Sequence, residues 1–259
     1  MTFSYPQKLS ELGHYVLNIQ RPAYGGTPMP SSTKPLLDSI PLVTDLIDQA
    51  YRGHAGAKGG IIIVGHSAGA ALAVAIAAQS DSQLPIIGLS LLGLVPTHRG
   101  NLLIPDPDPD PENPRLSGES MSPMASDFMG PLQYLNARVF GDGAMIKMIF
   151  EPLSRPEIRE YPGPEWHAML VDNFMPAIKV PVQYLATEYE GVWTGTAEGQ
   201  PLFDDFTKRF VNSPVVEAKL LSKGGHSYDF SRNAGELHDL RMKFIARLVR
   251  PSETPSDSN

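Results

Sequence analysis

The 259-residue sequence contains no cysteine, which excludes disulfide bonds, thiolate metal sites and a cysteine nucleophile. It has no run of lysine or arginine and a formal net charge of −7, so it lacks the basic surface expected of a nucleic-acid-binding protein. No stretch approaches the roughly eighteen apolar residues of a membrane-spanning helix, and the first residues lack the basic and apolar segments of a signal peptide. We therefore expect a cytoplasmic protein whose partner is a small molecule.

The length suits a single α/β domain that carries an insertion. From residue 15 onward strand-like and helix-like patterns alternate, which is typical of a mostly parallel, doubly wound sheet. Strands are expected over residues 15–19, 61–64, 85–95, 180–186 and 215–221. Helices are expected over residues 40–51, capped by Ser39, over residues 68–79, and along the closing stripe Leu237, Leu240, Phe244, Ile245, Leu248 and Val249.

The interval from residue 97 to residue 175 breaks this alternation. It begins near PDPDPDPENP, residues 105–114, whose alternating prolines exclude a helix or a central strand. Six of the ten methionines lie between residues 121 and 169, where they would suit either an adaptable ligand lining or a small irregular core. We predict a helical cap over residues 97–175, an α/β core over residues 1–96 and 176–250, and a disordered tail over residues 251–259.

The strongest chemical signal is GHSAG, residues 65–69. The pattern G-x-S-x-G alone occurs by chance in about one chain of this length in ten. Here it stands between the apolar run IIIV and the run AALAVAIAAQ, which is the strand–turn–helix order of a nucleophile elbow. Such a turn exposes the Ser67 hydroxyl and places the Ala68 N–H at a helix N-terminus, where it can bind an oxyanion. We predict that Ser67 is a nucleophile, rather than a small residue that merely permits the turn.

A serine nucleophile needs a histidine base and an acid, and in this arrangement the chain order is serine, acid, histidine. His226 follows the last predicted strand and precedes the closing helix, where a doubly wound sheet presents its loops, so we predict that it is the base. His238 falls within the closing helix, where a solvated or packing role is expected. Glu188 and Glu190 both follow a predicted strand, and Asp172 is a weaker third candidate for the acid.

With these residues assembled, the sequence resembles the α/β-hydrolase superfamily, and more narrowly the serine hydrolases of fungal secondary-metabolite and toxin gene clusters. Besides GHSAG, RPAYGGTP is similar to the family segment D-R-P-G-Y-G-x-S, and VPVQYLATEYEGVW is similar to V-P-V-x-x-x-x-G-E-x-D-x-x-W. The resemblance implies that Glu190 completes a catalytic triad with Ser67 and His226, and it implies no metal or organic cofactor. We further expect substrate contacts from His66, Trp193, Met124 and Phe128.

The resemblance also carries one departure. The superfamily begins with a β-hairpin and a third strand, whose following loop supplies a second oxyanion donor. The first residues here, MTFSYPQKLSELGHYVL, are instead similar to the helix after that loop, so the early strands and the loop are expected to be missing. Three explanations stay open: a shortened chain or fragment, a replacement donor near residues 24–27, or a protein that has abandoned hydrolysis.

The predicted activity is that of a serine esterase: an ester, thioester or lactone of an apolar small molecule is hydrolysed through an acyl-enzyme, in secondary metabolism. Two alternatives remain. One is a derivative of the fold that binds a ligand or partner without catalysis, and the other is an acyl-transfer or cyclisation enzyme that uses the same serine. A homodimer is also left open.

Overall fold

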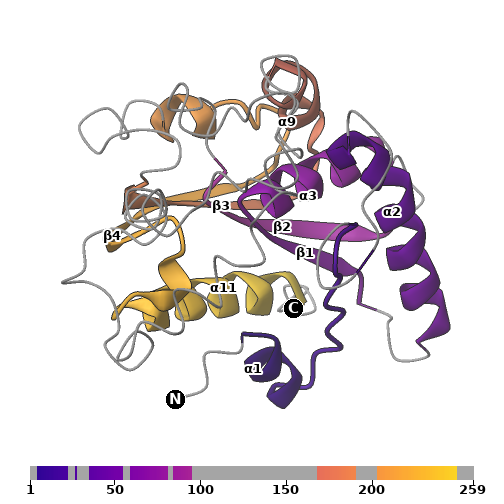
Figure 1. Cartoon of the computed structure of the whole chain (residues 1–259), viewed down its shortest axis with the longest axis horizontal. Coiled ribbons are helices and arrows are strands. Elements are labelled where there is room, and N and C mark those ends of the chain that lie inside the picture. Colours follow the sequence, from indigo (N-terminus) through magenta and orange to yellow (C-terminus); the bar gives the residue numbers. More distant parts are fainter. Residues whose placement is uncertain are drawn as a thin grey trace, which may run out of the picture.

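The computed structural model describes residues 5–22, 27, 35–54, 59–80, 84–94, 168–190 and 203–249. In this part of the chain a four-stranded, wholly parallel sheet is covered by helices on both faces, which confirms the predicted α/β class (Figure 1). The strands lie in chain order: β1 (Ile61–His66), β2 (Ile86–Leu92), β3 (Val182–Tyr189) and β4 (Val216–Gly225). All four therefore end at the same edge of the sheet, where the predicted site residues follow them.

One face of the sheet is covered by α3 (Ala68–Gln79), the helix that follows the predicted elbow. Its residues are small and apolar on every side, and those from Ala70 to Ile76 are all buried. A helix of this composition is stable only when it is enclosed. Here it lies between the sheet and a second layer formed by three helical elements, α2 (Pro35–Gly53), η3 (Met169–Phe174) and α9 (Met175–Ala177).

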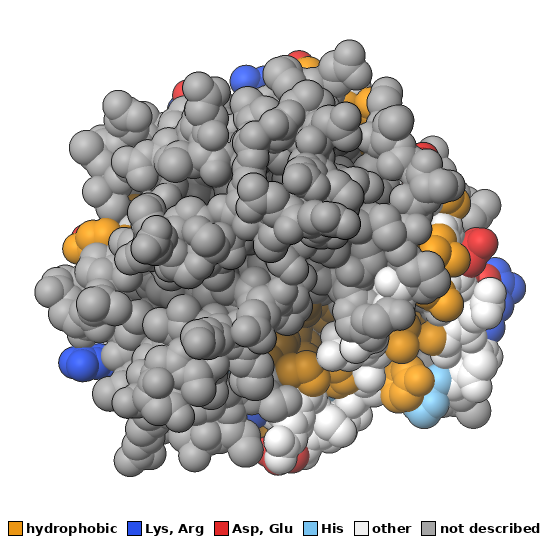
Figure 2. Space-filling view, in the orientation of Figure 1, with side chains coloured by type: hydrophobic (Ala, Val, Ile, Leu, Met, Phe, Trp, Pro, Cys, Tyr) orange, Lys and Arg blue, Asp and Glu red, His pale blue; other side chains and the backbone are white. Residues whose placement is uncertain are grey.

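The helix α2 begins earlier than the sequence pattern predicted. Pro35 stands at its first position, where the missing N–H of a proline costs no helical hydrogen bond. Ser39 consequently lies inside the helix, buried, and the prediction that it caps the helix is wrong. Leu42 and Leu46 of α2 are exposed. Figure 2 shows hydrophobic side chains at the surface on the side of the molecule where α2 lies. The buried stripe consists of Leu36, Ile40, Val43 and Ile47.

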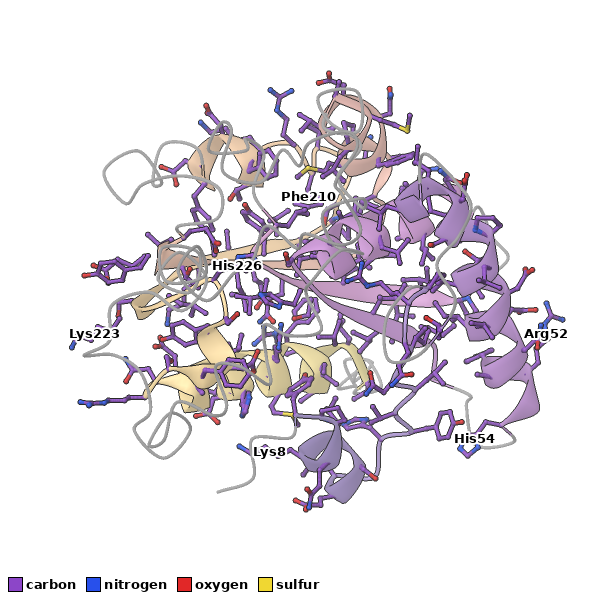
Figure 3. The ribbon with its side chains drawn as sticks, viewed as in Figure 1. Lys8, Arg52, His54, Phe210, Lys223 and His226 are labelled. Carbon is purple, nitrogen blue, oxygen red and sulfur yellow. The ribbon has the colours of Figure 1, made fainter. Side chains whose placement is uncertain are left out.

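The other face of the sheet is covered by α11 (Ala234–Val249), with α1 (Tyr5–Glu11) beyond it (Figures 1 and 3). Gly88 in β2 permits the close approach of α11, since a Cβ atom at this position would lie 2.3 Å from Leu248 Cδ1. Because the Leu248 side chain can rotate away, a larger residue at position 88 would be tolerated after a small rearrangement of Leu248. The predicted packing of the closing helix on the sheet is confirmed.

Residues 15–19 do not form the predicted first strand. Tyr15 and Leu17 are about half exposed, while Val16 packs against the cluster of Tyr5, Leu9 and Ile245. Within the described residues no strand pairs with this segment, and an extended segment without a ladder partner is not a strand. The prediction of a strand from YVLNI is therefore wrong.

Most of the predicted cap, and all of the predicted tail, lie outside the described residues. The described end of the cap interval, residues 168–175, belongs to η3 and α9 and packs on α3 within the main hydrophobic core. These residues thus contribute to the core, and the remaining cap boundaries stay predictions. Where the structure is described, no helix combines the length and apolar character that crossing a bilayer requires.

Candidate active site

Ser67 occupies a strained turn between β1 and α3. Its φ of 55° and ψ of −126° lie outside the favoured regions for a residue with a side chain, at a cost of about 1–3 kcal/mol. The turn is held by backbone hydrogen bonds: the Ser67 N–H donates to Leu92 O at the end of β2 (2.9 Å), and Ser67 O accepts from Ala70 N–H (2.9 Å). The Ser67 side chain makes no capping hydrogen bond to α3. These features are those of a nucleophile elbow, and they do not fit a serine that serves only as a helix cap.

The two glycines of GHSAG differ in their structural importance. A Cβ atom at Gly65 would lie 2.6 Å from Ala70 Cα and 2.7 Å from Gly69 O, both of which are backbone atoms that cannot move aside. A Cβ atom at Gly69 would meet nothing within 4 Å. A residue without a Cβ atom is therefore required at Gly65, where the first turn of α3 lies against the end of β1, and not at Gly69.

We expect Gly65→Ala to lower the free energy of unfolding by about 1–3 kcal/mol, because the added methyl group must displace the first turn of α3. Gly69→Ala is the matched control. It should leave stability unchanged or raise it by up to about 1 kcal/mol, since alanine is the better helix former. Urea unfolding followed by circular dichroism measures both. Equal losses in the two variants would contradict the close approach at Gly65.

Ala68 is the first residue of α3 and is buried. Backbone N–H groups in the first turn of a helix have no intrahelical carbonyl to bind. The Ser67 N–H is already committed to Leu92 O, whereas the Ala68 N–H stands at the helix start next to the Ser67 side chain. Its position at the helix start is compatible with an oxyanion donor, and that role stays a prediction.

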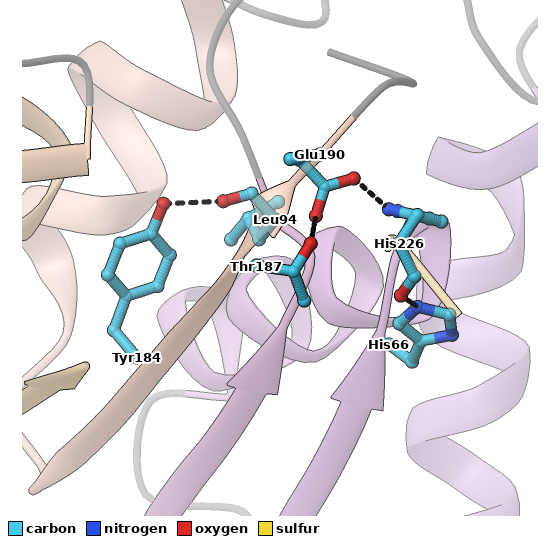
Figure 4. Close-up of polar contacts among 6 residues, drawn as sticks. All are labelled: His66, Leu94, Tyr184, Thr187, Glu190 and His226. Carbon is cyan, nitrogen blue, oxygen red and sulfur yellow. Dashed lines mark hydrogen bonds and ion pairs between the residues drawn. The ribbon is translucent and has the colours of Figure 1, made fainter. Parts of the chain in front are cut away.

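His226 and Glu190 meet at the ends of β4 and β3 (Figure 4). His226 Nδ1 is hydrogen-bonded to Glu190 Oε1, and the Thr187 hydroxyl donates to Glu190 Oε2 (3.1 Å), so both carboxylate oxygens are engaged. The His226 side chain is fully buried, and Glu190 is 4% exposed. Because an ionised carboxylate only accepts hydrogen bonds, Nδ1 carries the proton and Nε2 is the basic nitrogen of the neutral ring.

The other two candidate acids have different partners. Glu188 Oε2 accepts a hydrogen bond from the backbone N–H of Lys223 (2.8 Å), a residue held at a φ of 60° just before His226. Asp172 is exposed and pairs with Arg209 at 3.5 Å. Of the three carboxylates, Glu190 is the one that reaches His226. Glu188 instead fixes a strained point in the chain that carries His226.

His66 joins the elbow to His226. Its Nε2 lies 2.9 Å from the backbone O of His226, and the two imidazole rings are 4.7 Å apart between centroids (Figure 4). Removal of its ring from water, together with the neighbouring His226, lowers the pKa of His66 to about 3. The residue next to Ser67 is thus bonded directly to the predicted base, which brings Ser67 and His226 to one place at the sheet edge.

Gly93, just past the end of β2, lies against the ring of His226. It has a φ of 64°, and a Cβ atom there would lie 2.9 Å from His226 Cε1. Its N–H donates to Leu185 O (3.0 Å), and the Tyr184 hydroxyl donates to the next carbonyl, that of Leu94 (2.6 Å). Sequence reasoning missed Gly93, because nothing local in GLVP indicates which ring will rest on it.

A polar chain anchors the segment after His226. Asp229, in η4 (Tyr228–Phe230), accepts a hydrogen bond from His238 Nε2 (3.2 Å), and His238 Nδ1 accepts one from Lys8 Nζ (3.3 Å). Burial raises the pKa of Asp229, but the His238 bond and the charge of Arg241 outweigh it and leave the pKa lowered. His238 is buried, as a packing role would require, and it also ties η4 to α11 and α1.

Three of the predicted substrate contacts, Met124, Phe128 and Trp193, lie outside the described residues, as do residues 24–26 of the predicted replacement donor. Thr187, in contrast, is a site residue that the sequence did not single out. Its signal was its place three residues before Glu190 in TEYE, at a position where the family resemblance led us to expect glycine.

Comparison with known proteins agrees with this architecture. The family model described as "Alpha/beta hydrolase family" matches residues 2–240, while a search of curated protein sequences finds no match. An esterase from Exiguobacterium antarcticum has a similar structure, with a TM-score of 0.65 and 12% sequence identity over 93% of this chain and 85% of that chain.

Two further solved structures have related folds. For the enol-lactonase from Burkholderia xenovorans LB400 the TM-score is 0.58 and the identity 14%, over 88% of this chain and 79% of that chain. For an epoxide hydrolase from Vigna radiata the TM-score is 0.59 and the identity 14%, over 88% and 81%. Identities this low show a shared fold, and activity has to be argued from the site.

Proposed function

We propose that this chain, which belongs to the alpha/beta hydrolase family, is a serine hydrolase that cleaves an ester, thioester or lactone of an apolar small molecule through an acyl-enzyme. The observation that carries the proposal is the buried Glu190–His226 pair bonded through His66 to the strained turn at Ser67. A strained serine, a histidine with its tautomer fixed by a carboxylate, and a helix N-terminus together are the components of acyl transfer.

In the proposed reaction the Ser67 hydroxyl oxygen attacks the acyl carbon while His226 Nε2 takes the hydroxyl proton. Glu190 stabilises the resulting imidazolium through Nδ1, and the Ala68 N–H binds the oxyanion of the tetrahedral intermediate. The imidazolium then gives its proton to the leaving alcohol or thiol as the bond to the acyl carbon breaks. Water, deprotonated by His226, attacks the acyl-enzyme and releases the carboxylic acid and the free serine.

The choice of substrate class rests on the composition and on the related structures. The sequence has no run of lysine or arginine that would suit a polyanionic substrate, and the neighbours include an esterase and an enol-lactonase. We assign the protein to the cytoplasm and to secondary metabolism on the sequence arguments alone.

A fluorophosphonate probe tests this function directly, because it reacts only with an activated serine. We expect stoichiometric labelling, with the modified peptide identified by mass spectrometry as the one that contains Ser67, together with slow hydrolysis of a short-chain nitrophenyl ester. A folded protein that stays unlabelled would favour a non-catalytic binding derivative. A labelled protein that transfers acyl groups to an added amine or alcohol, and not to water, would favour acyl transfer or cyclisation.

A further inference from the structure

We propose that His66 is a positioning residue: its imidazole holds the backbone of His226 and thereby sets the direction of the His226 ring toward Ser67. This inference rests on the proposed function, because it assigns His226 as the base. It replaces the substrate contact that the sequence suggested for His66 with a contact inside the protein.

The hydrogen bond shows which ring nitrogen of His66 carries a proton. A backbone carbonyl only accepts hydrogen bonds, so the 2.9 Å contact with His226 O requires the proton on His66 Nε2. A neutral imidazole has one such proton, and Nε2 is therefore unavailable as a donor to a substrate. The bond spans 160 positions in the sequence and ties the nucleophile's neighbour to the base.

Packing adds to this hydrogen bond. The rings of His66 and His226 lie 4.7 Å apart with an interplanar angle of 39°. The same glycine supports both, because a Cβ atom at Gly93 would lie 2.9 Å from His226 Cε1 and 3.4 Å from His66 Cδ2. The His226 ring thus has three neighbours: Glu190 at Nδ1, the backbone of Gly93 and the ring of His66. Removal of the His66 ring would open one of these three sides.

The charge of His66 matters as much as its shape. Burial and the neighbouring His226 ring lower its pKa to about 3, and Arg241 lowers the pKa further. Asp229 and the hydrogen bond to His226 O oppose the shift without cancelling it. His66 therefore stays neutral when His226 becomes positively charged during the reaction. A permanently charged residue at position 66 would oppose that charge at a ring separation of 4.7 Å.

Three variants test whether the hydrogen bond of His66, rather than the volume of its side chain, positions His226. His66→Met keeps similar volume and removes the donor, whereas His66→Gln places an amide N–H at a comparable distance along the side chain. His54→Met is the matched control, since His54 is exposed and stacks on Tyr15 at 3.8 Å, on another part of the molecule. Urea unfolding first establishes that each variant is folded.

We expect His66→Met to lower kcat for a nitrophenyl ester by about 10–100-fold with KM changed less than about twofold, as misplacement of a base by a fraction of an ångström would do. His66→Gln should recover most of kcat, and His54→Met should match wild type. A higher KM at unchanged kcat would make His66 a substrate contact. Equal losses in the Met and Gln variants would also overturn the proposal.

A second measurement does not depend on activity. The proton on His226 Nδ1, shared with the Glu190 carboxylate, should give a far-downfield proton NMR signal in wild type, and that signal should broaden or vanish in His66→Met and persist in His66→Gln. An unchanged signal in His66→Met would contradict positioning. Wild type could show this NMR signal and yet fail to react with the fluorophosphonate probe. The proposed function would then be wrong, and the NMR signals of the His66 variants would still decide whether His66 holds His226.

Discussion

Ser67→Ala is expected to lower kcat for a nitrophenyl ester by about 10⁴–10⁶-fold and to abolish fluorophosphonate labelling. The reason is that no other hydroxyl is proposed to stand beside both the basic nitrogen of His226 and the Ala68 N–H. KM should change little, because the hydroxyl of Ser67 contributes to bond formation far more than to substrate affinity. Single-turnover kinetics with the nitrophenyl ester, combined with intact-protein mass spectrometry after labelling, measure both effects.

Two controls make this prediction specific to chemistry. Ser80→Ala removes a hydroxyl at the opposite end of the same helix, where Ser80 Oγ donates a long hydrogen bond to Ala77 O (3.4 Å), and it should leave kcat unchanged. Ser67→Gly should be inactive yet more stable than wild type by about 1 kcal/mol or more, because glycine adopts a φ of 55° without strain. Retention of labelling in Ser67→Ala would refute the assigned nucleophile.

The elements that the sequence predicted well are those whose signal is local. The limits of α3, residues 68–79, agree with the prediction because the apolar run, the tight turn and the alanine-rich helix each leave a distinct pattern in neighbouring residues. Residues 15–19 failed because a strand is defined by its partner, which lies elsewhere in the chain. Ser39 failed because two start signals competed, and Pro35 began the helix one turn earlier.

In the candidate site, too, some features could be predicted from the sequence and others could not. Ser67 and His226 could be predicted from the order of elements, because every parallel strand ends at the same edge and presents its following residues there. The contacts of Gly93 and His66 with His226 could not, since they join residues 133 and 160 positions apart without any repeating pattern. Between Glu188 and Glu190 only the resemblance gave a preference, and the contacts now give a physical reason for it.

Glu190→Gln is the variant with the second-largest expected effect, a fall in kcat of about 10³–10⁴-fold. The amide keeps the size of the side chain and its bond to Thr187, but it carries no charge to stabilise the imidazolium of His226. It can also donate to Nδ1, which would move the ring proton to Nε2 and leave no basic nitrogen for Ser67. Steady-state kinetics near neutral pH measure the loss.

Glu188→Gln is the matched control, because the same substitution is made two residues away, near the end of β3. The oxygen of its amide can still accept the Lys223 N–H, so the strained turn before His226 should persist and kcat should stay within about threefold of wild type. If Glu188→Gln loses as much activity as Glu190→Gln, the contact between Glu190 and His226 is not what determines the acid. A large fall in kcat in Glu190→Gln, but not in Glu188→Gln, is expected only if the Glu190 carboxylate bonded to Nδ1 acts directly on His226.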